Sequence, residues 1–119
     1  MLIGTNIAIE GHKSTIVSDT SNQFASLLYY ASDTYSKIDS SVMPKLSVSN
    51  LTIEGFHSVY NDGGAMSFDG DIDLELSTIV FRDDHSFLSG GAIAVTHNTY
   101  RINIYDCSFI NCYASGKNM

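Results

Sequence analysis

The chain has 119 residues, of which 44% are hydrophobic and 16% are charged, and its formal net charge is −7. This length allows one domain, and the hydrophobic fraction excludes a disordered segment. Six basic residues against thirteen acidic ones argue against nucleic acid or an anionic membrane surface as a partner, because both need a basic footprint. We expect no membrane-spanning segment, since no apolar run is long enough to cross a bilayer as a helix, and the N-terminus lacks the pattern of a signal peptide.

Residues 1–45 predict irregular β-structure at the start of the domain. Ser21–Ser32 contains three apolar residues at helical spacing, but its Tyr-Tyr pair and flanking serines favour a strand that ends at a corner. Residues 32–45 are rich in Ser and Asp and contain the only proline, which predicts an exposed inserted loop.

Residues 46–119 predict regular repeats of about 27 residues. The best alignment places Val48, Leu74 and Ile104 in one column and Ile53, Ile79 and Phe109 in another. Apolar residues alternate within each copy, which is typical of strands with one buried face. In the second copy we expect strands at Ile72–Leu76, Ser77–Phe81 and Gly91–Thr96.

Two similar tetrads, Gly63–Met66 and Gly90–Ile93, are separated by one repeat length. Glycine permits positive φ and close approach, so we expect equivalent corners that stack on each other. The predicted corner residues are Gly63, Gly64, Ala65, Gly90, Gly91 and Ala92. A phosphate-binding loop would need a different glycine spacing followed by a helix. The sequence therefore predicts an all-β fold, a short single-stranded parallel β-helix (a solenoid) of about four coils with an irregular N-terminal coil.

The tetrad Gly90–Ile93 resembles the GGAI motif of the polymorphic outer-membrane protein repeat, and Gly63–Met66 is a near copy. That family has a Phe-x-x-Asn element before the tetrad. Phe81–Asp84 and Phe109–Cys112 resemble this element, with Asp and Cys where Asn is expected. The resemblance implies a right-handed β-helix of the pectate-lyase-like kind in a cell-surface or secreted protein, often as a stalk or adhesin-like module. We then expect a segment of a longer solenoid, with neighbouring coils or another protein as its partner.

Acidic residues alternate in the stretch that begins at Phe68. On one strand, Asp69, Asp71, Asp73 and Glu75 would share a face. A row of this kind is too spread out for calcium unless a neighbouring coil adds oxygen ligands. We therefore interpret the row as a solvated face that discourages edge pairing, with Asp69, Asp71 and Asp73 as weak calcium candidates, and we predict no metal or other cofactor.

The stretch Phe81–His85, which reads FRDDH, contains the residue types that a pectin-degrading enzyme uses. Inverting hydrolysis needs two carboxyls roughly 6.5–9.5 Å apart, whereas Asp83 and Asp84 are adjacent and would diverge on a strand. The four histidines have no zinc-binding spacing. We predict no catalytic residue, and a fragment of a polysaccharide lyase or hydrolase is the alternative.

Cys107 and Cys112 are the only cysteines. Their spacing is not that of a CxxC motif, and we interpret them as buried thiols, with a local disulfide as the alternative. We interpret most of the seven tyrosines as half-buried packing residues, with stacking on surface glycans as the alternative for exposed ones. Together these patterns favour a non-catalytic structural or adhesin-like module.

Overall fold

The computed structural model describes residues 6–18, 26–31, 43–59, 62–98 and 100–116, which form strands and turns without a helix. The strands are β1 (Asn6–Val17), β2 (Leu28–Ala31), β3 (Lys45–Glu54), β4 (His57–Ser58), β5 (Met66–Asp69), β6 (Asp73–Arg82), β7 (His85–Ser86), β8 (Ile93–Thr96), β9 (Arg101–Tyr105), β10 (Ser108–Ile110) and β11 (Tyr113–Ala114). The all-β prediction is confirmed, and within these ranges there is no helix that could cross a membrane.

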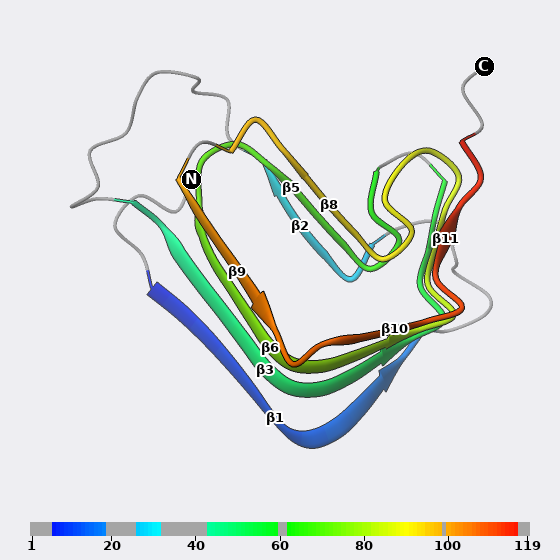
Figure 1. Cartoon of the computed structure of the whole chain (residues 1–119), viewed down its shortest axis with the longest axis horizontal. Coiled ribbons are helices and arrows are strands. Elements are labelled where there is room, and N and C mark those ends of the chain that lie inside the picture. Colours follow the sequence, from blue (N-terminus) through cyan, green and yellow to red (C-terminus); the bar gives the residue numbers. More distant parts are fainter. Residues whose placement is uncertain (1–5, 19–25, 32–42, 60–61, 99, 117–119) are drawn as a thin grey trace.

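The strands form three parallel sheets. Sheet A has the order β1-β3-β6, and both β9 and β10 pair with β6. Sheet B has the order β2-β5-β8, and sheet C has the order β4-β7-β11. The second pass of the chain (β3, β4, β5) and the third pass (β6, β7, β8) therefore visit the sheets in the same sequence, A, C, B. Figure 1 shows strands of one sheet lying over one another along the shortest axis of the molecule.

The pairing register differs from the predicted alignment by two residues. Val48 pairs with Leu76, not with Leu74, and Leu76 in turn pairs with Ile104. Met66 pairs with Ile93 in sheet B, where the spacing between partners is one residue shorter than in sheet A. Side chains on a strand alternate with a period of two, so a slip of two residues keeps the same face inward. Hydrophobic alternation could therefore identify the buried face but not the register.

Each long strand of sheet A bends at a residue with left-handed backbone conformation. Asn50 has φ 57° within β3, Thr78 has φ 53° within β6, and Asp106, between β9 and β10, has φ 54°. Asn and Asp tolerate this region, whereas it is unusual for a β-branched residue such as Thr78. The two strands predicted at Ile72–Leu76 and Ser77–Phe81 are thus one bent strand, and the bend is visible in Figure 1.

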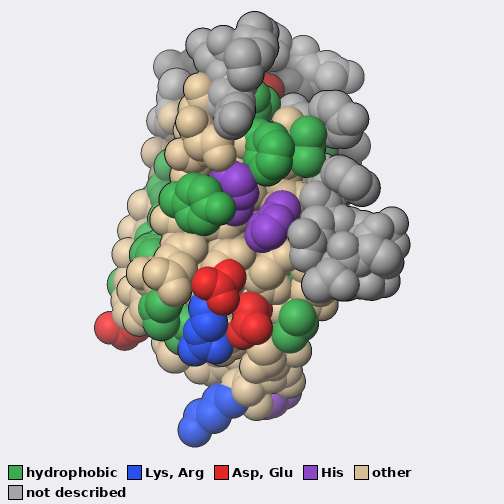
Figure 2. All heavy atoms as spheres, turned by 90° about the vertical axis from the view of Figure 1, so that its right-hand side faces the viewer, with side chains coloured by type: hydrophobic (Ala, Val, Ile, Leu, Met, Phe, Trp, Pro, Cys, Tyr) green, Lys and Arg blue, Asp and Glu red, His purple; other side chains and the backbone are tan. Residues whose placement is uncertain are grey.

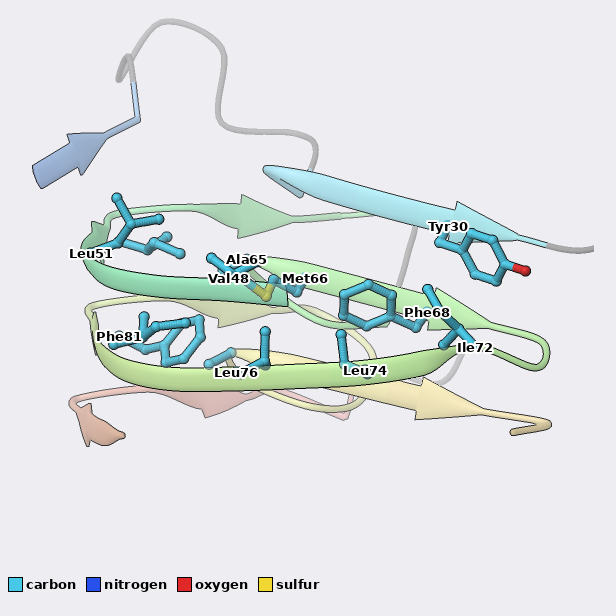
Figure 3. Packing of buried hydrophobic residues seen from close by; sticks show 13 residues of the cluster. Tyr30, Val48, Leu51, Ala65, Met66, Phe68, Ile72, Leu74, Leu76 and Phe81 are labelled. Carbon is cyan, nitrogen blue, oxygen red and sulfur yellow. The ribbon is translucent and has the colours of Figure 1, made fainter. Parts of the chain in front are cut away.

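The hydrophobic core lies between the sheets and is formed mainly by the second and third passes. Figure 3 shows its side chains pointing into the space between the strands. Fully buried apolar residues include Val48, Ile53, Met66, Phe68, Leu74, Leu76, Ile79 and Phe81. In contrast, Ile102, Ile104 and Phe109 continue the same columns in the last pass and are 41%, 42% and 51% exposed. The core is therefore open on the side of β9 and β10.

The irregular first part of the chain is described only in places. Ser21–Ser32 contains the strand β2, which confirms the preference for a strand over a helix where the structure describes it. Most of the predicted loop, residues 32–42, lies outside the described residues. Met43 and Pro44 are buried, and the Pro44 carbonyl accepts a hydrogen bond from the Asp73 amide at 2.9 Å. The predicted exposed loop is therefore wrong at its C-terminal end.

Candidate functional site

The two glycine tetrads lie against each other. The Gly63 amide donates to the Ser89 carbonyl at 2.8 Å, and the Ala65 amide donates to the Ala92 carbonyl at 2.8 Å. Gly63 and Gly90 have φ of 82° and 68°, which a side chain would disfavour. The tetrads therefore form a corner at which the chain turns from sheet C into sheet B.

The second glycine of each tetrad allows two backbones to approach closely. A Cβ atom on Gly64 would lie 2.6 Å from the His85 nitrogen and 2.8 Å from its carbonyl oxygen. A Cβ atom on Gly91 would lie 2.7 Å from the Tyr113 Cα. The absence of a side chain is thus a steric requirement of the contact between the corner and sheet C.

The acidic row does not share one strand, because the chain turns at Gly70 (φ 120°) between β5 and β6. Asp69 ends β5 and accepts a hydrogen bond from Thr96 at 3.1 Å, and its Oδ1 lies 2.6 Å from His97 Nδ1. The His97 hydrogen bond lowers the pKa of the Asp69 carboxyl. Asp71 lies in the turn, where its carbonyl accepts a hydrogen bond from the Tyr30 hydroxyl. The prediction of a single acidic face is therefore wrong.

Asp73 forms an ion pair within sheet A. Arg101 donates through Nε at 3.2 Å and through Nη2 at 2.9 Å, which lowers the pKa of the Asp73 carboxyl. Lys45 precedes Asp73 in the same column, so the charge alternates from strand to strand. Within the described ranges, no three His, Cys, Asp or Glu side chains come together as a group that could hold a metal ion.

The FRDDH stretch separates its two aspartates. Asp83 is exposed, with φ 56°, whereas Asp84 is fully buried and its Oδ1 accepts a hydrogen bond from the Phe56 amide at 3.0 Å. Asp84 Oδ2 is buried without a partner among the described residues. Burial raises the pKa of Asp84 to about 7, and the negative charges of Asp83 and Glu54 add to this effect. One carboxyl lies in the core and the other in solvent, so they do not face a common substrate.

We expect Asp84→Asn to stabilise the fold above pH 7 by up to about 4 kcal/mol, because the pKa of Asp84 is raised from 3.8 to about 7 and each pKa unit corresponds to about 1.4 kcal/mol. In the unfolded chain Asp84 ionises near its ordinary pKa of 3.8, but in the fold it stays protonated up to about 7. Between these two pH values Asp84 binds a proton in the folded state but not in the unfolded state. The free energy of unfolding of the parent chain therefore falls as pH rises from about 4 to 7. Urea denaturation across this pH range should give a flatter profile for the variant.

The matched control is Asp83→Asn, which removes the same charge from an exposed position. It should keep most of the pH dependence of the parent chain, because the buried carboxyl of Asp84 is retained. Equal effects of the two variants would contradict the assignment of this pH dependence to the buried carboxyl.

An aromatic column crosses sheet C, in which His57 pairs with His85 and His85 with Tyr113. The rings of His85 and Tyr113 stack at 4.0 Å with 21° between their planes. The rings of His57 and His85 meet edge to face at 5.5 Å. Figure 2 views the molecule from this side and shows histidine and acidic side chains among hydrophobic ones. Sequence reasoning missed the place of Tyr113, because only the observed register identifies it as the continuation of the histidines.

His85 also contacts a hydroxyl, since its Nε2 lies 2.6 Å from Ser115 Oγ. Burial lowers the pKa of His85, so its ring is neutral near pH 7 and could accept a proton from the serine. A serine–histidine pair usually needs a third group that orients the base. The adjacent carboxyl, that of Asp84, instead accepts from the Phe56 amide. Within the part of the chain that the structure describes, the pair therefore lacks the third member of such an arrangement.

A shallow pocket of about 500 Å³ lies beside this column and is lined by His57, Asp83, Asn111, Cys112 and Tyr113. The aromatic ring and the polar groups are of the kind that contact sugar faces and sugar hydroxyls. Tyr113 is 58% exposed, so its ring is accessible from solvent. Tyr29, Tyr100 and Tyr105 are also exposed, whereas Tyr30 is buried, so the prediction that most tyrosines are half-buried is wrong for those that the structure describes.

Both cysteines are free and half-buried. Cys107 Sγ donates to the Leu76 carbonyl at 3.8 Å, and Cys112 Sγ donates to the Phe81 carbonyl at 3.3 Å. Burial raises the pKa of both thiols. Both cysteines are thus free thiols in the structure, as predicted, but the prediction that they are buried is wrong, since each is half-buried. The raised pKa makes them weak nucleophiles at neutral pH.

No family model, no curated protein and no solved structure matches the chain. Its relation to the polymorphic outer-membrane protein repeat is therefore a resemblance of short motifs.

Proposed function

We propose that the chain is a segment of a right-handed parallel β-helix that serves as a non-catalytic structural or adhesin-like module of a cell-surface or secreted protein. The observation that carries the proposal is the common register of the sheets. Parallel pairing at nearly the same spacing recurs in sheets A, B and C, and in sheets A and B apolar side chains lie over apolar side chains. Such an arrangement supports a stalk, because every pass has the same shape and adds length along one axis.

The resemblance to the polymorphic outer-membrane protein repeat supplies the handedness and the surface location. Its two motif elements agree with the contacts described above. The tetrads hydrogen-bond to each other, and Phe81 and Phe109, which begin the Phe-x-x-Asn-like elements, stack at 5.1 Å with 4° between their planes. Asp84 and Cys112 are each the fourth residue of their element. This equivalence agrees with a corner that recurs in successive passes.

The geometry of the acids supports a non-catalytic role. Asp83 is exposed and Asp84 is buried, and Asp69 and Asp73 are each engaged with a basic side chain. A hydrolase needs two carboxyls that converge on one bond. This arrangement favours the module over a fragment of a polysaccharide hydrolase.

Antibody labelling of the source cells tests the location, and an activity assay tests the chemistry. We expect antibodies against the chain to label intact cells or the culture medium. We expect no release of reducing ends or unsaturated uronides from polygalacturonate. Labelling that requires permeabilised cells would contradict the proposed location, and turnover that is lost in a denatured sample would contradict the proposed role.

A further inference from the structure

The open side of the core presents an apolar surface, which we call the C-terminal face. An open hollow of about 480 Å³ on this face is lined mainly by Ile93, Val95, Ile102, Ile104, Phe109 and Cys112. Most of the corresponding apolar residues of strands β3 and β6 are buried, because the next strand of sheet A covers them. The C-terminal face is therefore shaped to receive another layer of the same kind.

Two aromatic rings at this end of the molecule, one on the C-terminal face and one in sheet C, are stacked on a neighbour and still exposed. Phe109 stacks on Phe81 and remains 51% exposed, and Tyr113 stacks on His85 and remains 58% exposed. The strands β9 and β10 pair with β6, and among the described strands none lies on their other edge. Unpaired strand edges are templates for pairing with another chain. One more parallel strand could therefore pair with the free backbone edge of β9 and β10 and pack against these rings.

The strand β1, at the opposite end of sheet A, has apolar residues at the positions that such a strand would need. It pairs with β3, and among the described strands none covers its other edge. Its register with β3 and β6 defines three columns that run through the whole sheet, Ile7–Leu46–Leu74–Ile102, Ile9–Val48–Leu76–Ile104 and Ile16–Ile53–Phe81–Phe109. A second copy placed one layer beyond β9 would set its Ile7, Ile9 and Ile16 over Ile102, Ile104 and Phe109.

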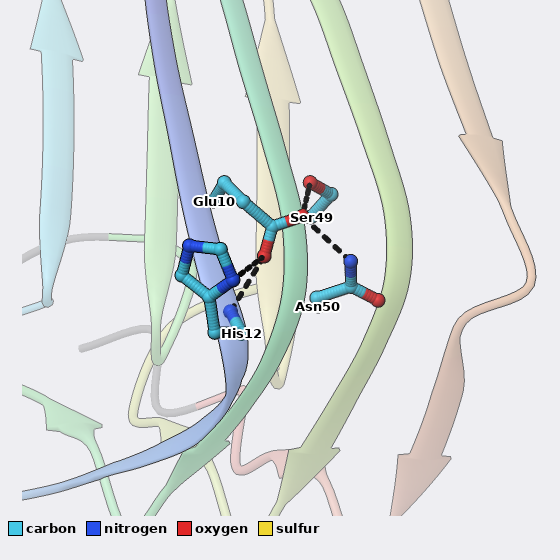
Figure 4. Close-up of polar contacts among 4 residues, drawn as sticks. All are labelled: Glu10, His12, Ser49 and Asn50. Atoms are coloured by element: carbon cyan, nitrogen blue, oxygen red, sulfur yellow. Dashed lines mark hydrogen bonds and ion pairs between the residues drawn. The ribbon is translucent and has the colours of Figure 1, made fainter.

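The charges at this junction are also complementary. Glu10 pairs with Ser49 and Ser14 with Leu51, so the bulge Gly11–Lys13 lies opposite Asn50. Asp106 occupies the column of Asn50 two layers further on, and it is exposed, as is Lys13. A stacked copy would therefore bring its Lys13 to Asp106. Figure 4 shows Glu10, the acidic residue beside the bulge, directed toward Ser49 and Asn50 of its own chain, with Asn50 Nδ2 at 2.6 Å.

We infer that two copies of this chain associate head to tail, with β1 of one copy pairing in parallel with β9 and β10 of the other. The inference rests on the proposed stacking of equivalent passes and adds a specific partner. Each added copy presents a new C-terminal face, so the contact does not close and produces linear assemblies. Parallel pairing requires this polarity, since a face-to-face dimer would reverse the strand direction.

Sedimentation velocity of the chain over a range of concentrations tests the assembly. We expect association to rise with concentration, and we expect Lys13→Asp and Asp106→Lys each to weaken it about tenfold, because each places like charges together. The double variant should restore association. A mixture of the two single variants should associate better than either alone, since Lys at 106 of one copy then meets Asp at 13 of the other.

Asp83→Lys is the matched control, because Asp83 has the same exposure and left-handed backbone as Asp106 but lies on the flank of the third pass. It should associate like the parent chain. A parent chain that stays monomeric at every concentration, a control that weakens association equally, or a double variant without recovery would each overturn the inference. A monomer with the circular dichroism of β-structure would overturn the head-to-tail contact alone and leave the proposed function standing.

Discussion

Gly64→Ala is expected to destabilise the fold by about 3 kcal/mol or more, because the added methyl group has no space. Its Cβ would meet the backbone nitrogen and carbonyl oxygen of His85, which are fixed by the pairing of β7 within sheet C. Backbone atoms cannot rotate away as a side chain can, so the corner or sheet C would have to move. Equilibrium denaturation with urea measures the effect.

Gly55→Ala is the control that distinguishes the cost of a steric clash from the cost of a left-handed backbone conformation. Gly55 has φ 78°, but a Cβ there would have no atom within 4 Å. We expect this variant to cost about 1–2 kcal/mol, from the left-handed conformation alone. Similar losses for both variants would mean that the close approach at Gly64 does not set the cost.

Phe81→Ala is expected to destabilise the fold by about 3–5 kcal/mol, the usual range for removing a buried aromatic ring. Phe81 is fully buried at the centre of its column and stacks on Phe109. The neighbouring passes hold the surrounding side chains in place, so the cavity can collapse only in part. The loss should appear as a lower urea midpoint without a change in the slope of the transition.

Phe109→Ala removes the same ring from the next position in the column. Because Phe109 is 51% exposed, we expect a loss well below that of Phe81→Ala, about 1.5 kcal/mol at a concentration where the chain is monomeric. Equal losses at such a concentration would show that the C-terminal face is covered within a single chain.

The fold class was predictable because alternation and turn residues are local signals. Apolar alternation indicated the long strands of sheet A, and the glycine tetrads indicated a recurring corner. The strands β4 and β7 have two residues each, too short for any periodicity. The bend at Thr78 was unpredictable for another reason, because a β-branched residue rarely adopts positive φ. Here the pairing of β6 with its neighbouring strands holds the residue in this conformation.

The candidate site was less predictable than the fold. The divergence of Asp83 and Asp84 followed from their adjacency on an extended chain. The burial of Asp84 and the contact of His85 with Ser115 depend on how side chains from successive passes pack together, which apolar alternation does not specify. A correct register would have placed His57, His85 and Tyr113 in one column from the sequence alone.

The alternating column of Lys45, Asp73 and Arg101 has a consequence for how such a chain could change length during evolution. A tandem duplication of residues 73–100 would preserve the hydrophobic columns, because the inserted unit matches the period of sheet A. It would also set two copies of Asp73 against each other, where like charges repel. Duplication of the two units 45–100 together would keep the alternation intact, so gene growth by pairs of units is favoured over growth by one.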